Sequence, residues 1–169
     1  MQKVLVAIDG ASHCQHAVQH VMAEFRRQPA LEIHLLNVQR PFSGYVRRFI
    51  DRATMQAAHQ EASDAALQPV RQMLDAAGVP YGVHSAVGEK AAAIVATAQR
   101  LHCDHIVVGT GRKNSLVRFI EGSVTNQLLE QTTVPVLAIA GNAASRIERY
   151  GIPTGVSALL AWLLFSATA

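Results

Sequence analysis

Short apolar runs separated by longer helical patterns constrain the architecture of this chain more than any other feature. The runs are rich in Val, Ile and Leu without strict alternation, and they cover residues 4–8, 33–38, 106–108 and 134–140, with a weaker fifth run at 79–87. Near-continuous apolar strands that alternate with helices are typical of a parallel sheet covered on both faces. The sequence therefore predicts a single-domain α/β fold with right-handed crossovers.

The segments between these runs carry apolar helical faces. The first has Ser12 and Gln15 at capping-box spacing, and its expected inner face is Cys14, Ala17, Val18, Val21, Met22 and Phe25. The second helix is predicted over 52–77 and ends at Gly78 and Pro80. Its expected inner stripe is Ala66, Val70, Met73 and Ala77, with Leu67 and Leu74 beside it. Two further helices are predicted over 89–101 and from 122–123 to before Pro135.

Composition excludes several classes of protein. The chain has 169 residues and a net charge of +3, and its basic residues are scattered, with no stripe suited to nucleic acid. Stacking platforms for bases are scarce, since only three Tyr, one Trp and five Phe are present. The two cysteines form no disulfide framework, and the N-terminus does not resemble a signal peptide. We therefore expect a cytoplasmic protein that binds no nucleic acid.

Polar and glycine-rich segments follow the first and fourth predicted strands. Asp9-Gly10 follows one strand, Gly109-Thr110-Gly111-Arg112 the other, with Ser115 beyond it and Gly122-Ser123 at the start of a helix. Ligands of doubly wound sheets bind beyond the carboxyl ends of the strands. Glycines permit close backbone approach, and a helix N-terminus favours anions. The pattern indicates a polyphosphate site, with Asp9 accepting hydrogen bonds from a sugar or base; a tight strand exit without a ligand is the alternative.

The order of these motifs resembles the universal stress protein family. The resemblance is carried by Val4-Leu5-Val6-Ala7-Ile8-Asp9-Gly10, Gly88-Glu89, Val107-Val108-Gly109-Thr110, Gly122-Ser123-Val124 and Val134-Pro135-Val136-Leu137. It covers about residues 1–141 and implies an open five-stranded parallel sheet with helices on both faces, Rossmann-like and similar to the adenine nucleotide alpha hydrolases. It also implies frequent homodimers and, in one branch, ATP binding through Gly-2x-Gly-9x-Gly-Ser/Thr.

The resemblance transfers most, but not all, of the nucleotide motif. Gly109 matches the first glycine and Gly122-Ser123 the last pair, but Arg112 stands at the middle glycine; using Gly111 instead lengthens the spacing to Gly122 to ten residues. Asp9 and Val38 match positions that hold the ribose and adenine. The predicted cofactor-binding residues are Asp9, Gly10, Val38, Gly109, Thr110, Gly111, Arg112, Ser115, Gly122, Ser123, Val124 and Val136. The predicted ligand is ATP, with Mg²⁺ as a further candidate.

No catalytic set can be named from the sequence. One sector of the first predicted helix carries His13, His16 and His20, and we favour a solvated helix face over a metal site there. The segment 102–105 also has metal-ligand residue types, and a structural role is again favoured over a metal site. No pair of carboxylates is assigned acid and base roles. We expect a protein that is not an enzyme and has no metal site of its own, with ATP hydrolysis at most slow and incidental.

The chain divides into a universal stress protein domain at 1–141 and a linker with a hydrophobic C-terminal helix at 142–169. Residues 150–169 lack charge, but glycines and a proline weaken the first third, so a helix docked on the domain is favoured over a membrane anchor. Three functions are open: an ATP-binding regulatory stress protein, a nucleotide-free dimeric scaffold, and a membrane-tethered sensor. The resemblance implies that the last strand, 134–140, lies at a sheet edge, and a homodimer through this strand is the expected assembly.

Overall fold

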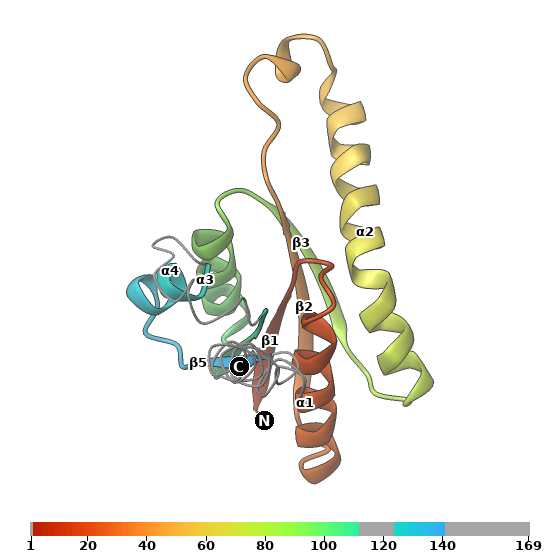
Figure 1. Cartoon of the computed structure of the whole chain (residues 1–169), viewed down its shortest axis with the longest axis vertical. Coiled ribbons are helices and arrows are strands. Elements are labelled where there is room, and N and C mark those ends of the chain that lie inside the picture. The colour runs from red at the N-terminus through yellow and green to blue at the C-terminus, as the bar shows by residue number, and fades with distance from the viewer. Residues whose placement is uncertain (1, 112–123, 141–169) are drawn as a thin grey trace, which may run out of the picture.

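Every predicted strand is present in the computed structural model, which describes residues 2–111 and 124–140 (Figure 1). The elements in chain order are β1 (Lys3–Ile8), α1 (Cys14–Arg27), β2 (Glu32–Gln39), the 3-10 helix η1 (Val46–Arg48), α2 (Arg52–Ala76), β3 (Gly82–Val87), α3 (Lys90–Leu101), β4 (His105–Thr110), α4 (Val124–Gln131) and β5 (Val136–Ala140). The α/β class is therefore confirmed.

The five strands form one parallel sheet in the order β3-β2-β1-β4-β5. The central strand β1 pairs with β2 on one side and with β4 on the other, so that Val6 lies opposite both Leu35 and Val107. The chain first winds outward from β1 through β2 to β3 and then returns to the other side of β1. The strand order thus reverses between β1 and β4, which is where ligands of open α/β sheets bind.

Helices cover both faces of the sheet. Figure 1 shows α1 and α2 on one face and α3 and α4 on the other. Alternate β1 residues enter different cores, because Val4 and Val6 pack with α1 and α2 whereas Leu5 packs with α3 and α4. All three side chains are fully buried. This double coverage explains why the central strands are apolar without alternation.

The start of α1 differs from the predicted capping box. The N-cap position is His13, and no side chain caps the helix there. Instead, the Asp9 carboxylate accepts a hydrogen bond from the Ala11 backbone N–H at 2.9 Å. The prediction of a Ser12 cap was therefore wrong, because a carboxylate at the end of β1 takes up the donor of the preceding turn. The predicted inner face of α1 is confirmed.

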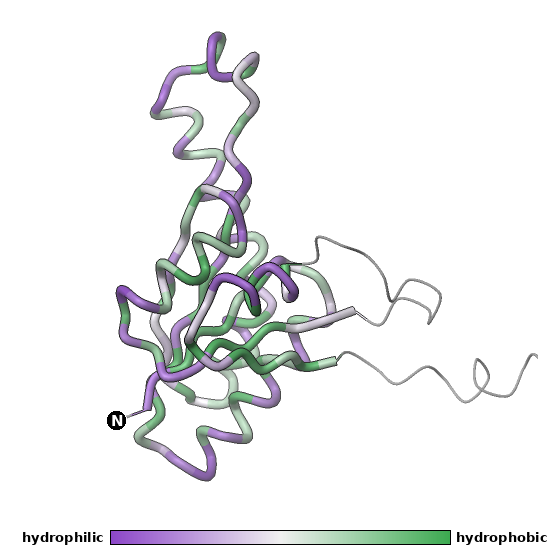
Figure 2. The backbone as a smooth tube through the Cα atoms, turned by 90° about the vertical axis from the view of Figure 1, so that its left-hand side faces the viewer, coloured by the Kyte–Doolittle hydropathy of each residue, from purple (hydrophilic) through white to green (hydrophobic). Residues whose placement is uncertain are grey.

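The buried stripe of α2 is displaced from the predicted one. Its buried residues are Ser63, Leu67, Val70 and Leu74, whereas Ala77 is exposed. The large Leu and Val side chains fix the phase of the helix. The N-terminal part of α2 and the preceding segment project beyond the sheet (Figures 1 and 2). Gly78 ends the helix as predicted, with a positive φ of 63° that favours glycine.

The strand β5 is more exposed than its apolar sequence suggested. It lies at one edge of the sheet, and Leu137, Ala138 and Ala140 are exposed. The prediction of a strand buried on both faces is wrong here: Val136 and Ile139 pack on the two cores but stay half-buried, because the helices cover this edge of the sheet incompletely. Within the described part of the chain, β5 pairs with β4 alone. Within residues 2–111 and 124–140, no helix is long and apolar enough to span a bilayer. The predicted C-terminal helix at 142–169 lies outside the described residues.

Candidate functional site

A pocket of about 70 Å³ opens at the carboxyl ends of β1 and β4, where the strand order reverses. Its walls are mainly aliphatic, with an acid, a thiol, an amine and a hydroxyl among them. The lining residues are Ala7, Ile8, Asp9, Cys14, Leu36, Val38, Lys90, Ile94, Val108, Gly109, Val124 and Thr125. Aliphatic walls with a few convergent polar groups are typical of small-molecule sites.

A second hollow of about 280 Å³ adjoins this pocket. The two share Asp9, Val38 and Lys90, and the outer hollow adds the polar side chains of Asn37, Gln39 and Arg40. The inner pocket alone is smaller than sites that hold drug-sized ligands. A ligand as large as a nucleotide therefore has to occupy both spaces, with its apolar part inside and its polar part in the outer hollow.

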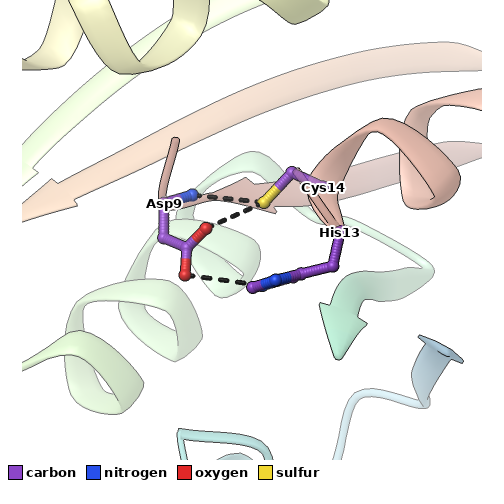
Figure 3. A group of neighbouring side chains, drawn as sticks. All are labelled: Asp9, His13 and Cys14. Carbon is purple, nitrogen blue, oxygen red and sulfur yellow. Dashed lines mark hydrogen bonds and ion pairs between the residues drawn. The ribbon is translucent and has the colours of Figure 1, made fainter. Parts of the chain in front are cut away.

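Asp9 lines the pocket and contacts the side chains of His13 and Cys14 (Figure 3). One carboxylate oxygen accepts hydrogen bonds from the Cys14 thiol at 3.0 Å and from the Ala11 N–H, and the other lies 3.5 Å from His13 Nε2. The Cys14 sulfur in turn lies 3.4 Å from the Asp9 N–H. These contacts fix the carboxylate where β1 passes into α1, while part of it still faces solvent.

The ionisation of this cluster follows from its surroundings. Burial raises the pKa of the Cys14 thiol to about 12, and the hydrogen bond to Asp9 adds to the effect. For Asp9 burial alone would raise the pKa, but the hydrogen bonds from Cys14 and Ala11 outweigh it, with smaller contributions from the charges of His13 and Lys90. The pKa of Asp9 therefore lies below its ordinary value, and the site presents a carboxylate beside a protonated thiol at neutral pH.

Gly109 permits the close approach of α1 to β4. A Cβ atom at this position would lie 2.7 Å from the His13 carbonyl oxygen and 3.0 Å from its Cδ2 atom. The imidazole also faces Gly111, whose Cβ position would be 3.6 Å from Nδ1. Packing between two elements thus explains Gly109 without a ligand, although the residue also lines the pocket.

Asn37 and Lys90 are site residues that sequence reasoning missed. Asn37 is 1% exposed, donates to the Ile8 carbonyl at 2.8 Å and accepts from Gln39 at 2.7 Å, so it holds β2 to the end of β1 beside the outer hollow. Lys90, the first residue of α3, lines both spaces. Asn37 was missed because it lies within the apolar run 33–38, which was interpreted only as a buried strand. Nothing local to Lys90 in the sequence signals its proximity to Asp9.

The structure brings together part of the predicted cofactor-binding set. Asp9, Val38, Gly109 and Val124 line the inner pocket. Gly10, Thr110, Gly111 and Val136 do not line it; Gly10 packs against Ala66, and Val136 packs on the core beneath α3 and α4. The remaining predicted residues, Arg112, Ser115, Gly122 and Ser123, lie outside the described residues.

Comparison with known proteins identifies the family. The universal stress protein family model matches residues 1–140, so the chain belongs to this family. Among curated proteins, the universal stress protein MJ0531 of Methanocaldococcus jannaschii is 27% identical over 141 residues, which cover 82% of this chain and 81% of that protein.

Solved structures share the fold. A universal stress protein family protein of Arabidopsis thaliana with AMP bound superposes with a TM-score of 0.60 at 20% identity, covering 85% of this chain and 94% of that one. A universal stress protein in complex with cAMP also gives 0.60 at 20% identity, covering 82% and 96%. The predicted family and the five-stranded parallel fold are both confirmed.

Proposed function

We propose that this protein is a regulatory stress-response protein that binds an adenine nucleotide and does not act as an enzyme. The proposal rests on the pocket at the point where the strand order reverses. Four predicted site residues line this pocket: Asp9 after β1, Val38 in β2, Gly109 in β4 and Val124 at the start of α4. Two fold relatives were solved with AMP and with cAMP. Their ligands share the adenosine moiety, which supports an adenine nucleotide as the ligand class.

The pocket offers a distinct environment for each part of such a ligand. The aliphatic side chains of Leu36 and Val38 suit the base, and the Asp9 carboxylate suits the ribose hydroxyl groups. Lys90 and Arg40 supply positive charge for phosphates in the outer hollow. More specifically, we propose that the ligand is ATP with Mg²⁺ on its phosphates. Arg112 and Gly122-Ser123 are assigned to the phosphates on the sequence motif alone.

Lys90→Ala is expected to weaken ATP binding by about 1.5–3 kcal/mol, the contribution of a hydrogen bond to a charged group. Arg100→Ala is the matched control, because Arg100 is an exposed cation in the last turn of the same helix α3. Calorimetric titration of both variants with ATP measures the difference. Equal affinities for the two variants would remove Lys90 from the phosphate site.

We also propose a homodimer through β5. The strand has an open edge in the described structure, with Leu137 39% exposed. Pairing with a second copy satisfies the open backbone groups.

Leu137→Asp is expected to weaken the dimer at least about tenfold in light scattering. Val83→Asp on the opposite edge strand β3, where Val83 is 41% exposed, should leave it intact. A wild-type chain that stays monomeric at micromolar concentration would refute the dimer.

The other two functions remain distinguishable alternatives. A nucleotide-free dimeric scaffold predicts the same assembly but no nucleotide binding. A membrane-tethered sensor depends on residues 150–169, which lie outside the described residues. A cytoplasmic location and the membrane-associated alternative both stay predictions.

A further inference from the structure

Three side chains with good ligand atoms for a transition metal meet beside the pocket. Asp9, at the end of β1, and the neighbours His13 and Cys14, at the start of α1, place one carboxylate oxygen, one imidazole nitrogen and one sulfur within 4.8 Å of one another (Figure 3). Carboxylate, imidazole and thiolate are the three kinds of ligand that proteins use for zinc. Among the residues that the structure describes, this is the one group of three or more such side chains.

The separations fit a tetrahedral ion. Bonds of about 2.0–2.3 Å from zinc to nitrogen, oxygen and sulfur place neighbouring ligand atoms about 3.3–3.6 Å apart. One Asp9 oxygen lies 3.0 Å from Cys14 Sγ, and the other lies 3.5 Å from His13 Nε2. One ligand atom from each residue already lies within 4.8 Å of the other two, so rotations of the side chains are needed to bring one oxygen, the nitrogen and the sulfur around a single ion.

The surrounding structure already orients each ligand. The His13 ring is packed against the glycines at the end of β4, with Nε2 turned toward Asp9. Cys14 belongs to the buried face of α1, and its sulfur lies on the pocket wall. The Asp9 carboxylate is held by the Ala11 N–H. Pre-oriented ligands of this kind lower the cost of binding a metal.

Access and an open coordination position are also present. The side chains of Asp9 and His13 are 43% and 24% exposed, which gives an ion a path from solvent. Asp9 and Cys14 both border the pocket, so a water molecule or a ligand atom can supply the fourth donor from that side. Three protein ligands with water or a ligand atom in the fourth position are one of the two usual arrangements of zinc sites in proteins.

We propose that Asp9, His13 and Cys14 form a site for Zn²⁺ or a similar thiolate-binding divalent cation. A soft sulfur and an imidazole distinguish it from a Mg²⁺ site, which takes oxygen ligands. Cys14 loses its proton to solvent when the metal–sulfur bond forms, and no redox step is involved. The site does not depend on the proposed nucleotide, although Asp9 is common to both, so that the metal and the nucleotide should compete for that carboxylate.

Cobalt(II) tests the site directly, since a cobalt–thiolate bond gives a near-ultraviolet charge-transfer band. The full chain, reduced and stripped with EDTA, is titrated with Co²⁺ and then with Zn²⁺. We expect one equivalent of Co²⁺ to produce the band and Zn²⁺ to abolish it. Cys14→Ser should remove the band, whereas Cys103→Ser should keep it, because Cys103 is buried in the core on the other face of the sheet.

A second pair of variants avoids the buried thiol. His13→Asn should weaken Co²⁺ binding at least about tenfold, whereas His20→Asn, on an exposed part of α1, should not. Circular dichroism checks that each variant is folded. Absence of the band in the wild type, its survival in Cys14→Ser or its loss in Cys103→Ser would each overturn the proposal. Nucleotide calorimetry in EDTA is independent, so failure of either proposal can be told from failure of the other.

Discussion

Gly109→Ala is expected to lower the free energy of unfolding by about 1–3 kcal/mol, the usual cost of overpacking. The new Cβ atom would meet the His13 carbonyl oxygen at 2.7 Å, and this atom belongs to the backbone, which cannot move aside cheaply. The start of α1 would have to shift away from β4 and carry His13 and Cys14 with it, which would disturb their contacts with Asp9. Nucleotide affinity should therefore fall at least about tenfold in the same variant.

Gly88→Ala is the matched control for Gly109→Ala. Nothing lies within 4 Å of the Cβ position of Gly88, and its φ is not in the left-handed region. The substitution should leave stability unchanged or raise it by about 0.4–1 kcal/mol, through the lower entropy of the unfolded chain. Chemical denaturation measures both variants. Equal stability of the two would show that α1 does not pack on β4 as closely as described.

Leu67→Ala should cause the largest loss of stability, about 2–5 kcal/mol. Leu67 is fully buried between α2 and the sheet, in the core that also contains Val4 and Val6. Removal of its side chain leaves a cavity that the surrounding strands cannot fill. Leu129→Ala makes the same chemical change on α4 at a side chain that is 60% exposed, so we expect an effect within about 0.5 kcal/mol.

Urea unfolding of both Leu variants tests the placement of α2 as well as the core. Leu67 stood beside the predicted inner stripe of the helix, whereas the structure places it at the centre of the buried face. A loss for Leu67→Ala no greater than that for Leu129→Ala would contradict this phase of α2.

The central strands β1, β2 and β4 could be predicted because their coverage on both faces demands apolar residues at most positions. The phase of α2 could not, since alanines at positions such as 66 and 77 suit either face, and only packing decides between them. The position of β5 at the edge of the sheet could not be predicted from its apolar sequence either. It came instead from the family resemblance, which places this strand at the end of the sheet.

The residues of the candidate pocket that depend on local sequence pattern could be predicted, whereas those brought there by the packing of distant segments were missed. Asp9 and Gly109 follow apolar runs, so their place at the carboxyl edge could be inferred from the sequence. Lys90 and Asn37 reach the same space from strands and helices distant in sequence, which no spacing rule reveals. No Ser12 cap forms, because the Asp9 carboxylate accepts the Ala11 N–H of the turn before α1, an arrangement that the capping-box spacing could not reveal.

The most direct test of the central claim is calorimetric titration of the full, metal-free chain with ATP and with AMP. We expect saturable binding of about one nucleotide per chain, with a dissociation constant at or below about 100 μM, equivalent to a binding free energy of about −5.5 kcal/mol. Binding should weaken in Lys90→Ala and persist in Arg100→Ala. A folded wild-type chain that gives no saturable binding of either nucleotide at high protein concentration would contradict the claim and favour the nucleotide-free dimeric scaffold.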